Sequence, residues 1–229
     1  MGYSRKEEIA RLRQQRREAK ALKKRKENVR DELVRFLIVC EGTKTEPHYF
    51  EALVKDYTST VREVTIEGAG RATVALVDRT FEIKQDLERK NAMSFDRVWV
   101  VFDKDDFGDF NEAIKKANEL GFQSAWTNEA FELWYYLHFE YLDTSISRED
   151  YIDKLQNAFR KKIGDDNFKY CKGNPNIYKL LQQYGREDLA KRFAQQLRGL
   201  YTDTDYATHK PCTMVDKLVE ELEHPEKLL

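Results

Sequence analysis

Acidic side chains follow two apolar segments of this chain, at positions where they could act together. Residues 36–40 are an apolar run that ends at Glu41, and residues 97–102 are a second run that ends at Asp103 and Asp105. Short apolar runs of this kind are typical of buried strands. Parallel strands end at one edge of a sheet, where α/β proteins bind their ligands. We therefore expect Glu41, Asp103 and Asp105 to converge.

Converging carboxylates of this kind favour a divalent cation. Mg²⁺ and Mn²⁺ prefer oxygen ligands, retain some of their waters and bind substrate phosphates. Without a cation the carboxylates would repel one another. The alternative is that turn-forming aspartates simply end a strand, which is common for one aspartate but less so for two apolar strands that end alike. The sequence thus predicts a Mg²⁺ or Mn²⁺ site with one or two ions.

The order of the expected elements indicates the fold class. Strands and helices alternate up to residue 139, with strands at 36–40, 61–66, 97–102 and 123–126 and helices at 45–54, 72–89, 110–120 and 129–139. This order implies an α/β fold with a mostly parallel sheet and helices on both faces. Beyond residue 143 the pattern predicts helices without strands, at 149–163, 174–184, 186–198 and 213–222.

Charge and composition divide the chain into three parts. Residues 1–32 are a basic arm, helical or disordered; residues 33–143 are the α/β domain, and residues 144–229 are a helical extension packed on it. The first 30 residues contain 12 Lys/Arg and 4 Asp/Glu, whereas the whole chain has a net charge of −1. Such an arm either contacts phosphates or is a solvated tail. The candidate phosphate-binding residues of the arm are Arg11, Arg13, Arg16, Arg17, Lys23, Lys24 and Arg25.

Several protein classes are disfavoured by composition. Three widely spaced cysteines indicate neither a disulfide framework nor a zinc site. No segment approaches the ~18 apolar residues of a membrane span, and no signal peptide is evident, so a cytoplasmic protein without membrane contact is expected. The stretch around Lys44 lacks the first glycine of a phosphate-binding loop, and the stretch after Asp103 has Ile114 where a calcium-binding EF-hand needs glutamate.

Three stretches together resemble the RloB-like family, which is related to the Toprim fold of topoisomerases, primases and OLD-type nucleases. They are residues 36–50, 98–107 and 128–139. The resemblance implies that Glu41 acts in acid–base chemistry or binds metal, and that Asp103 and Asp105 are a metal-binding pair. It also implies that Glu46 holds a second metal ion. Family members are similar to the Toprim-like partner of AAA-type ATPases in abortive-infection phage defence, so such an ATPase encoded alongside is the expected partner.

Three further residues are candidates with weaker signals. Glu132 could complete a second metal site or face solvent on its helix, and Lys44 could contact phosphate or be a solvated loop residue. Residues 170–178 resemble a Tyr/Lys-Asn-Pro stretch of the same family, which implies that Lys172, or alternatively Lys169, neutralises charge in the transition state.

The sequence and its resemblance predict a metal-dependent nuclease that cleaves phosphodiester bonds, with DNA favoured over RNA as the substrate. A catalytically weak, nucleic-acid-binding subunit of an ATPase complex is the alternative. A third interpretation is small-molecule phosphotransfer with Asp103 as the nucleophile. A homo-oligomeric state stays open.

Overall fold

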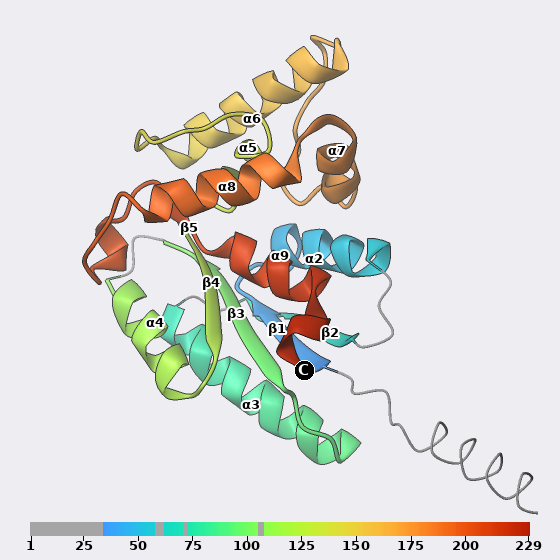
Figure 1. The fold of residues 1–229 in the computed structure, drawn as a ribbon, viewed down its shortest axis with the longest axis vertical. Coiled ribbons are helices and arrows are strands. Elements are labelled where there is room, and N and C mark those ends of the chain that lie inside the picture. The colour runs from blue at the N-terminus through green and yellow to red at the C-terminus, as the bar shows by residue number, and fades with distance from the viewer. Residues whose placement is uncertain (1–33, 58–61, 71–72, 105–107) are drawn as a thin grey trace, which may run out of the picture. The chain divides into compact units, whose positions relative to one another are not determined.

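The computed structural model describes residues 34–57, 62–70, 73–104 and 108–229, which form a five-stranded sheet in the order β2-β1-β3-β4-β5 (Figure 1). The first four strands are parallel, and β5 runs antiparallel to β4. The strands are β1 (Val34–Cys40), β2 (Arg62–Gly68), β3 (Arg97–Asp103), β4 (Gln123–Asn128) and β5 (Cys212–Thr213). The α/β fold with a mostly parallel sheet, expected from the sequence, is therefore confirmed.

Helices cover both faces of the sheet (Figure 1). One face carries α3 (Thr73–Asn91) and α4 (Phe110–Glu119), and the other carries the remaining helices. These are α2 (Thr45–Asp56), α5 (Glu132–Tyr136), α6 (Arg148–Ile163), α7 (Ile177–Tyr184), α8 (Glu187–Arg198) and α9 (Val215–Glu223). Among the described residues, no helix is long and apolar enough to cross a bilayer.

Alternating strand residues supply two separate cores. Phe36 and Ile38 of β1 belong to the core beneath α2 and the C-terminal helices, whereas Leu37 and Val39 belong to the core beneath α3 and α4. All four side chains are buried. A strand buried on both faces has no polar side, which explains why β1 reads as an unbroken apolar run in the sequence.

Two local expectations were wrong. Helix α5 begins at Glu132 rather than at Glu129, because Glu129 has a φ of 92° and cannot belong to a right-handed helix. The extension is not purely helical either. Its short strand β5 extends the sheet, and the hydroxyls of Thr127 and Thr213 share a hydrogen bond of 2.9 Å across the β4–β5 pair.

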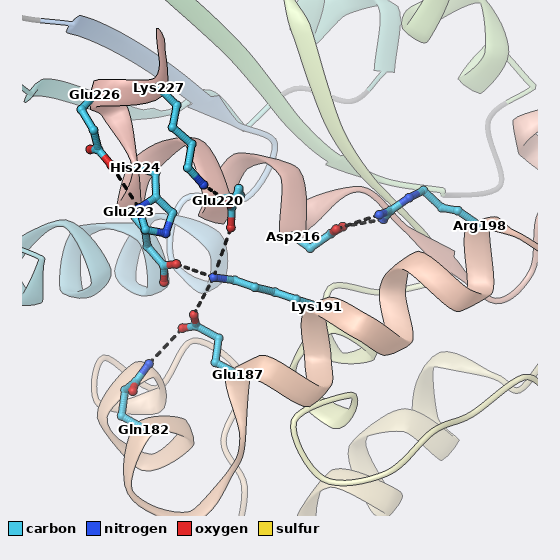
Figure 2. Close-up of polar contacts among 10 residues, drawn as sticks. All are labelled: Gln182, Glu187, Lys191, Arg198, Asp216, Glu220, Glu223, His224, Glu226 and Lys227. Atoms are coloured by element: carbon cyan, nitrogen blue, oxygen red, sulfur yellow. Dashed lines mark hydrogen bonds and ion pairs between the residues drawn. The ribbon is translucent and has the colours of Figure 1, made fainter. Parts of the chain in front are cut away.

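Lys191 of α8 lies at the centre of an ionic network that joins α8 to α9 (Figure 2). Its ammonium contacts Glu187 at 3.0 Å and also pairs with Glu223 of α9. Gln182 of α7 donates a 3.0 Å hydrogen bond to Glu187, so the network extends to a third helix. Burial and the facing Glu223 carboxylate raise the pKa of Glu187 to about 7. Glu187 and Glu223 therefore both pair with the Lys191 ammonium, and the repulsion between them means that Glu187 loses its proton only near neutral pH.

The network predicts how stability varies with pH. The folded-state pKa of Glu187 lies above its unfolded value, so the stabilisation from protonated Glu187 is present below about pH 4.5 and is lost as the pH rises through about 7. Glu187→Gln cannot ionise, and its amide can donate to Glu223 while accepting from Lys191. Urea unfolding should show the variant gaining about 2 kcal/mol relative to wild type between pH 5 and 8. The exposed change Glu119→Gln is the control, and a constant difference across this pH range would contradict the prediction.

Candidate metal centre

The first two candidate residues meet where β1 and β3 end. These strands are parallel neighbours, with Cys40 opposite Val101, so their carboxyl ends lie side by side. The backbone N–H of Glu41 donates to the carbonyl of Val101 at 2.8 Å, which extends the pairing by one residue. The Glu41 Oε2 atom in turn accepts a 3.2 Å hydrogen bond from the backbone N–H of Asp103. Glu41 and Asp103 thus converge, as the sequence suggested.

Glu46 reaches the same place from the first turn of α2. A Cβ atom built on Gly42 would lie 2.2 Å from the Oε2 atom of Glu46, so the Glu46 carboxylate folds back over the glycine turn. Only a residue without a side chain leaves room for this approach. The Glu46 side chain is buried as a result.

Glu132 lies at the start of α5 and is fully buried. Its Oε1 atom accepts a 3.1 Å hydrogen bond from the Tyr170 hydroxyl. The residue before it, Phe131, donates its backbone N–H to the Asp103 Oδ2 atom at 3.1 Å. The solvent-facing interpretation of Glu132 is therefore wrong, and the β4–α5 connection orients both Asp103 and Glu132.

Three buried carboxylate oxygens of this group lack a hydrogen-bond partner among the described residues: Glu46 Oε2, Asp103 Oδ1 and Glu132 Oε2. Burial, together with the nearby Glu46 and Glu132 carboxylates, raises the pKa of Asp103 well above its usual range. Burial also raises the pKa of Glu46. Buried acceptors with no donor are costly in a folded protein. Hard, negatively charged oxygens are the ligands that Mg²⁺ and Mn²⁺ require, so this donor set fits such an ion.

Spacing limits how these residues could share one ion. Among the described residues, the group of three acidic or histidine side chains whose ligand atoms all lie within 4.8 Å of one another is Glu220, Glu223 and His224 (Figure 2). That group already holds the ammonium of Lys191, which explains its charge without a metal. The strand-end carboxylates are more widely spread. They fit an ion that keeps some of its waters, with a water between the ion and the more distant carboxylates. The predicted ligand Asp105 lies outside the described residues.

Cationic side chains line the same cavity, which has a volume of about 260 Å³. Arg148, Lys44 and Lys172 form part of its wall together with Glu41, Glu46 and Asp103. Arg148 also donates a 2.7 Å hydrogen bond to the Glu129 carbonyl. Its positive charge lowers the pKa of Asp103, in opposition to burial. Anionic and cationic groups therefore face one small space, as a site for a metal-bound phosphate requires.

Sequence reasoning missed Arg148. The residue follows Ser147, the N-cap of α6, whose hydroxyl accepts from the Asp150 backbone in a capping box. This signal marks the start of a helix but does not indicate which way the neighbouring arginine points. Lys44 and Lys172, by contrast, lie in the cavity, and their roles stay predictions. The predicted phosphate-binding residues of the arm, Arg11, Arg13, Arg16, Arg17, Lys23, Lys24 and Arg25, lie outside the described residues.

Comparison with known proteins gives one match. A protein-family model described as RloB-like protein matches residues 36–222, which include the residues that line the cavity and all five strands except the first two residues of β1. No curated protein and no solved structure matches the chain significantly.

Proposed function

Since this chain belongs to the RloB-like protein family, we propose that it is a metal-dependent nuclease that cleaves the phosphodiester bonds of nucleic acid. The observation that carries the proposal is the set of buried carboxylate oxygens without partners on Glu46, Asp103 and Glu132. Uncompensated buried charge is strongly destabilising, so buried carboxylates without partners at a strand edge indicate a functional role. The role that we propose is to bind a metal ion that acts on a phosphate.

The residues that would hold Mg²⁺ or Mn²⁺ are Asp103, Glu46 and Glu132, with Glu41 and Asp105 as further ligands. A bound ion would supply a positive charge that stabilises the transition state and lowers the pKa of a bound water. The phosphate specificity follows from the cations opposite the acids. A carboxylate cluster alone would repel a phosphodiester, whereas Arg148 and Lys172 offer donors to its oxygens.

Glu41 is the candidate general base. Of the described acidic residues that line the cavity, Glu41 is partly exposed, whereas Glu46 and Asp103 are buried. The backbone N–H of Asp103 holds its Oε2 atom in place. In the proposed reaction the water oxygen bonds to phosphorus while its proton passes to Glu41. The bond from phosphorus to the leaving oxygen breaks, and that oxygen takes a proton from solvent and leaves as a hydroxyl group. Arg148 and Lys172 bind the non-bridging oxygens as negative charge develops on them.

A cleavage assay with Glu41→Gln tests the proposed function. The purified chain should nick plasmid DNA or cut single-stranded oligonucleotides in Mn²⁺ and should lose this activity in EDTA. Because a glutamine oxygen still accepts from the Asp103 backbone, Glu41→Gln should keep the fold but cleave about 10²–10³-fold more slowly. Glu67→Gln is a matched control, since Glu67 is an exposed glutamate near the end of the neighbouring strand β2. Metal-independent cleavage, or an active Glu41→Gln, would contradict the proposal.

The charge distribution favours a second candidate, a nucleic-acid-binding subunit of an ATPase complex with little activity of its own. The first 30 residues are strongly basic, although the whole chain has a net charge of −1, so the remainder is acidic. An acidic body could bind a basic face of the AAA-type ATPase that the family resemblance implies, in a phage-defence system. Cleavage that appears only after that ATPase is added would support this candidate.

A further inference from the structure

A second and larger cavity lies between α2 and α7, with a volume of about 610 Å³. Most of the residues that line it have polar or charged side chains: His48, Glu51, Lys55, Asp56, Asn176, Lys179, Gln182 and Gln183. Ala52 and Pro175 are small apolar contributions, and Tyr178 donates its hydroxyl to Asp56 at 3.1 Å. A lipid or an apolar peptide would leave these polar groups without partners. The α2–α7 groove, defined by these residues, therefore suits a polar ligand.

The groove follows one face of α2 away from the acidic cavity. Lys44, His48, Glu51 and Lys55 are separated by four, three and four positions, so they form a stripe along the helix. Lys44 lines the acidic cavity at one end of this stripe, whereas Lys55 lines the groove at the other. At 1.5 Å per residue, the 12 residues of α2 span about 18 Å. That length can follow several nucleotides of an extended strand.

The chain from Lys172 to Asn176 connects the two spaces. Lys172 lines the acidic cavity, and Asn176 lines the groove. Between them, the carbonyl of Gly173 is 3.0 Å from the Nδ1 atom of His48. A Cβ atom on Gly173 would lie 3.3 Å from the Cβ atom of Lys44. The Gly173–Lys44 contact thus lies between the two spaces, and a ligand that crosses it passes directly from one space to the other.

Cationic and amide groups are available to such a ligand. Lys55 and Lys179 are exposed, and neither forms an ion pair with the residues that the structure describes. Asp56, one of the two acidic residues of the groove, is engaged by Tyr178. Lysine ammonium groups bind phosphates, and side-chain amides hydrogen-bond to both phosphates and base edges. Lys55 and Lys179 line the groove, and Lys44 and Lys172 line the acidic cavity, so the two spaces together offer four lysines.

We propose that the α2–α7 groove binds a single strand of nucleic acid as it continues from the acidic cavity, with Lys55 and Lys179 contacting its phosphates. The proposal rests on the nuclease function above, because that function places a phosphodiester in the cavity. A single strand is favoured over a duplex because one backbone follows a concave path between two helices, with its bases open to the amides. DNA and RNA share this chemistry.

Binding of labelled oligonucleotides tests the groove directly. Fluorescein-labelled 12-mers, in deoxy and ribo forms, are titrated with the full chain in Ca²⁺ and followed by anisotropy. Lys55→Gln/Lys179→Gln should weaken binding about tenfold and reduce the salt-dependence slope by about 1.4, since each lost phosphate contact on a single strand removes about 0.7. Comparing the two oligonucleotides separates DNA from RNA. A 12-bp duplex that shows the larger loss would overturn the single-strand assignment.

A matched pair of lysines serves as the control. Lys90 and Lys115 lie exposed on α3 and α4, which cover the opposite face of the sheet. Lys90→Gln/Lys115→Gln removes the same net charge and should leave both the affinity and the slope unchanged. Residues 1–33 are present in every variant, so any contribution of the basic arm cancels in the comparison. Equal behaviour of the two double variants would overturn the proposal.

A small substrate separates failure of the groove from failure of the proposed function. Bis(p-nitrophenyl) phosphate reaches only the acidic cavity, so the groove variant should hydrolyse it in Mn²⁺ at the wild-type rate while it cleaves the 12-mer less efficiently through a higher KM. If the groove variant hydrolyses bis(p-nitrophenyl) phosphate at the wild-type rate and also binds the 12-mer as tightly as the wild type, the proposal for the groove is overturned and the proposed nuclease function is not. Absence of hydrolysis in the wild type overturns the nuclease, and the anisotropy comparison still decides the groove.

Discussion

Replacing Asp103 with asparagine is expected to remove metal-dependent cleavage and, without metal, to raise the thermal stability of the protein. Asp103 is buried, and its pKa is raised because of burial and the neighbouring carboxylates. Since the folded-state pKa exceeds the unfolded one, any stability from the protonated form is present at low pH and is lost as the pH rises. Ionisation of Asp103 in the folded protein therefore costs stability, and the neutral amide avoids this cost.

The geometry around Asp103 accommodates the amide. An asparagine oxygen can replace Oδ2 as the acceptor for the Phe131 N–H, which leaves the NH₂ group in the position of the unpartnered Oδ1. There the amide carries no charge for the Glu46 and Glu132 carboxylates to repel. Removing this repulsion is worth about 1 kcal/mol, which corresponds to a rise in Tm of about 2–4 °C for a chain of this size.

Asp103→Asn should increase thermal stability but decrease the rate of cleavage. Differential scanning calorimetry in EDTA should show the rise in Tm, whereas cleavage in Mn²⁺ should fall about 10³-fold because a proposed metal ligand is lost. Added Mn²⁺ should raise the Tm of the wild type more than that of the variant. Asp153→Asn makes the same change at an exposed position on α6 and should alter neither quantity. A less stable Asp103→Asn that still cleaves would show that the carboxylate is structural.

Local sequence patterns were sufficient to predict the four parallel strands of the sheet and two residues of the site. The buried strands β1 and β3 are continuous apolar runs, and a parallel sheet brings the residues after them to one edge. Glu41 and Asp103 could therefore be placed together without knowledge of any side-chain contact. Glu46 was indicated by the resemblance to the RloB-like family, and the glycine turn after Glu41 is what lets its side chain fold back to the same place.

The remaining features depend on contacts between distant segments. The Asn128 side chain donates to the carbonyls of Tyr206 and Ala207, from the segment just before β5. Glu129, which follows it, adopts a positive φ, so α5 starts later than its composition indicates. Strand β5 has two residues, too few for any periodicity to indicate a strand. Such tertiary contacts override local propensity, and no window of sequence contains them.

Arg148 is the site residue that depends most clearly on such tertiary contacts. Its replacement distinguishes a role in binding the metal from a role in the cleavage reaction. Arg148→Gln should reduce cleavage about 10²-fold, because the site loses a preorganised cation that faces the phosphate. Arg148→Lys restores the charge but not the planar fork that also holds the Glu129 carbonyl, so it should recover only part of the rate. Arg160→Gln is the matched control. Arg160 lies on the same helix and donates to the Phe168 carbonyl at 2.9 Å, outside the cavity lining.

Affinity for Mn²⁺ should not fall together with cleavage in Arg148→Gln. The arginine charge lowers the pKa of Asp103 and Glu46, so its loss favours protons on these carboxylates. The arginine charge also repels a divalent ion. Because Mn²⁺ carries two charges and displaces one proton, removing the arginine favours binding of Mn²⁺ more than it favours binding of the proton. Calorimetric titration at pH 8 should therefore show Mn²⁺ binding that is unchanged or tighter, in contrast to Asp103→Asn. Loss of Mn²⁺ binding together with cleavage would mean that Arg148 organises the metal ligands rather than contacting the phosphate.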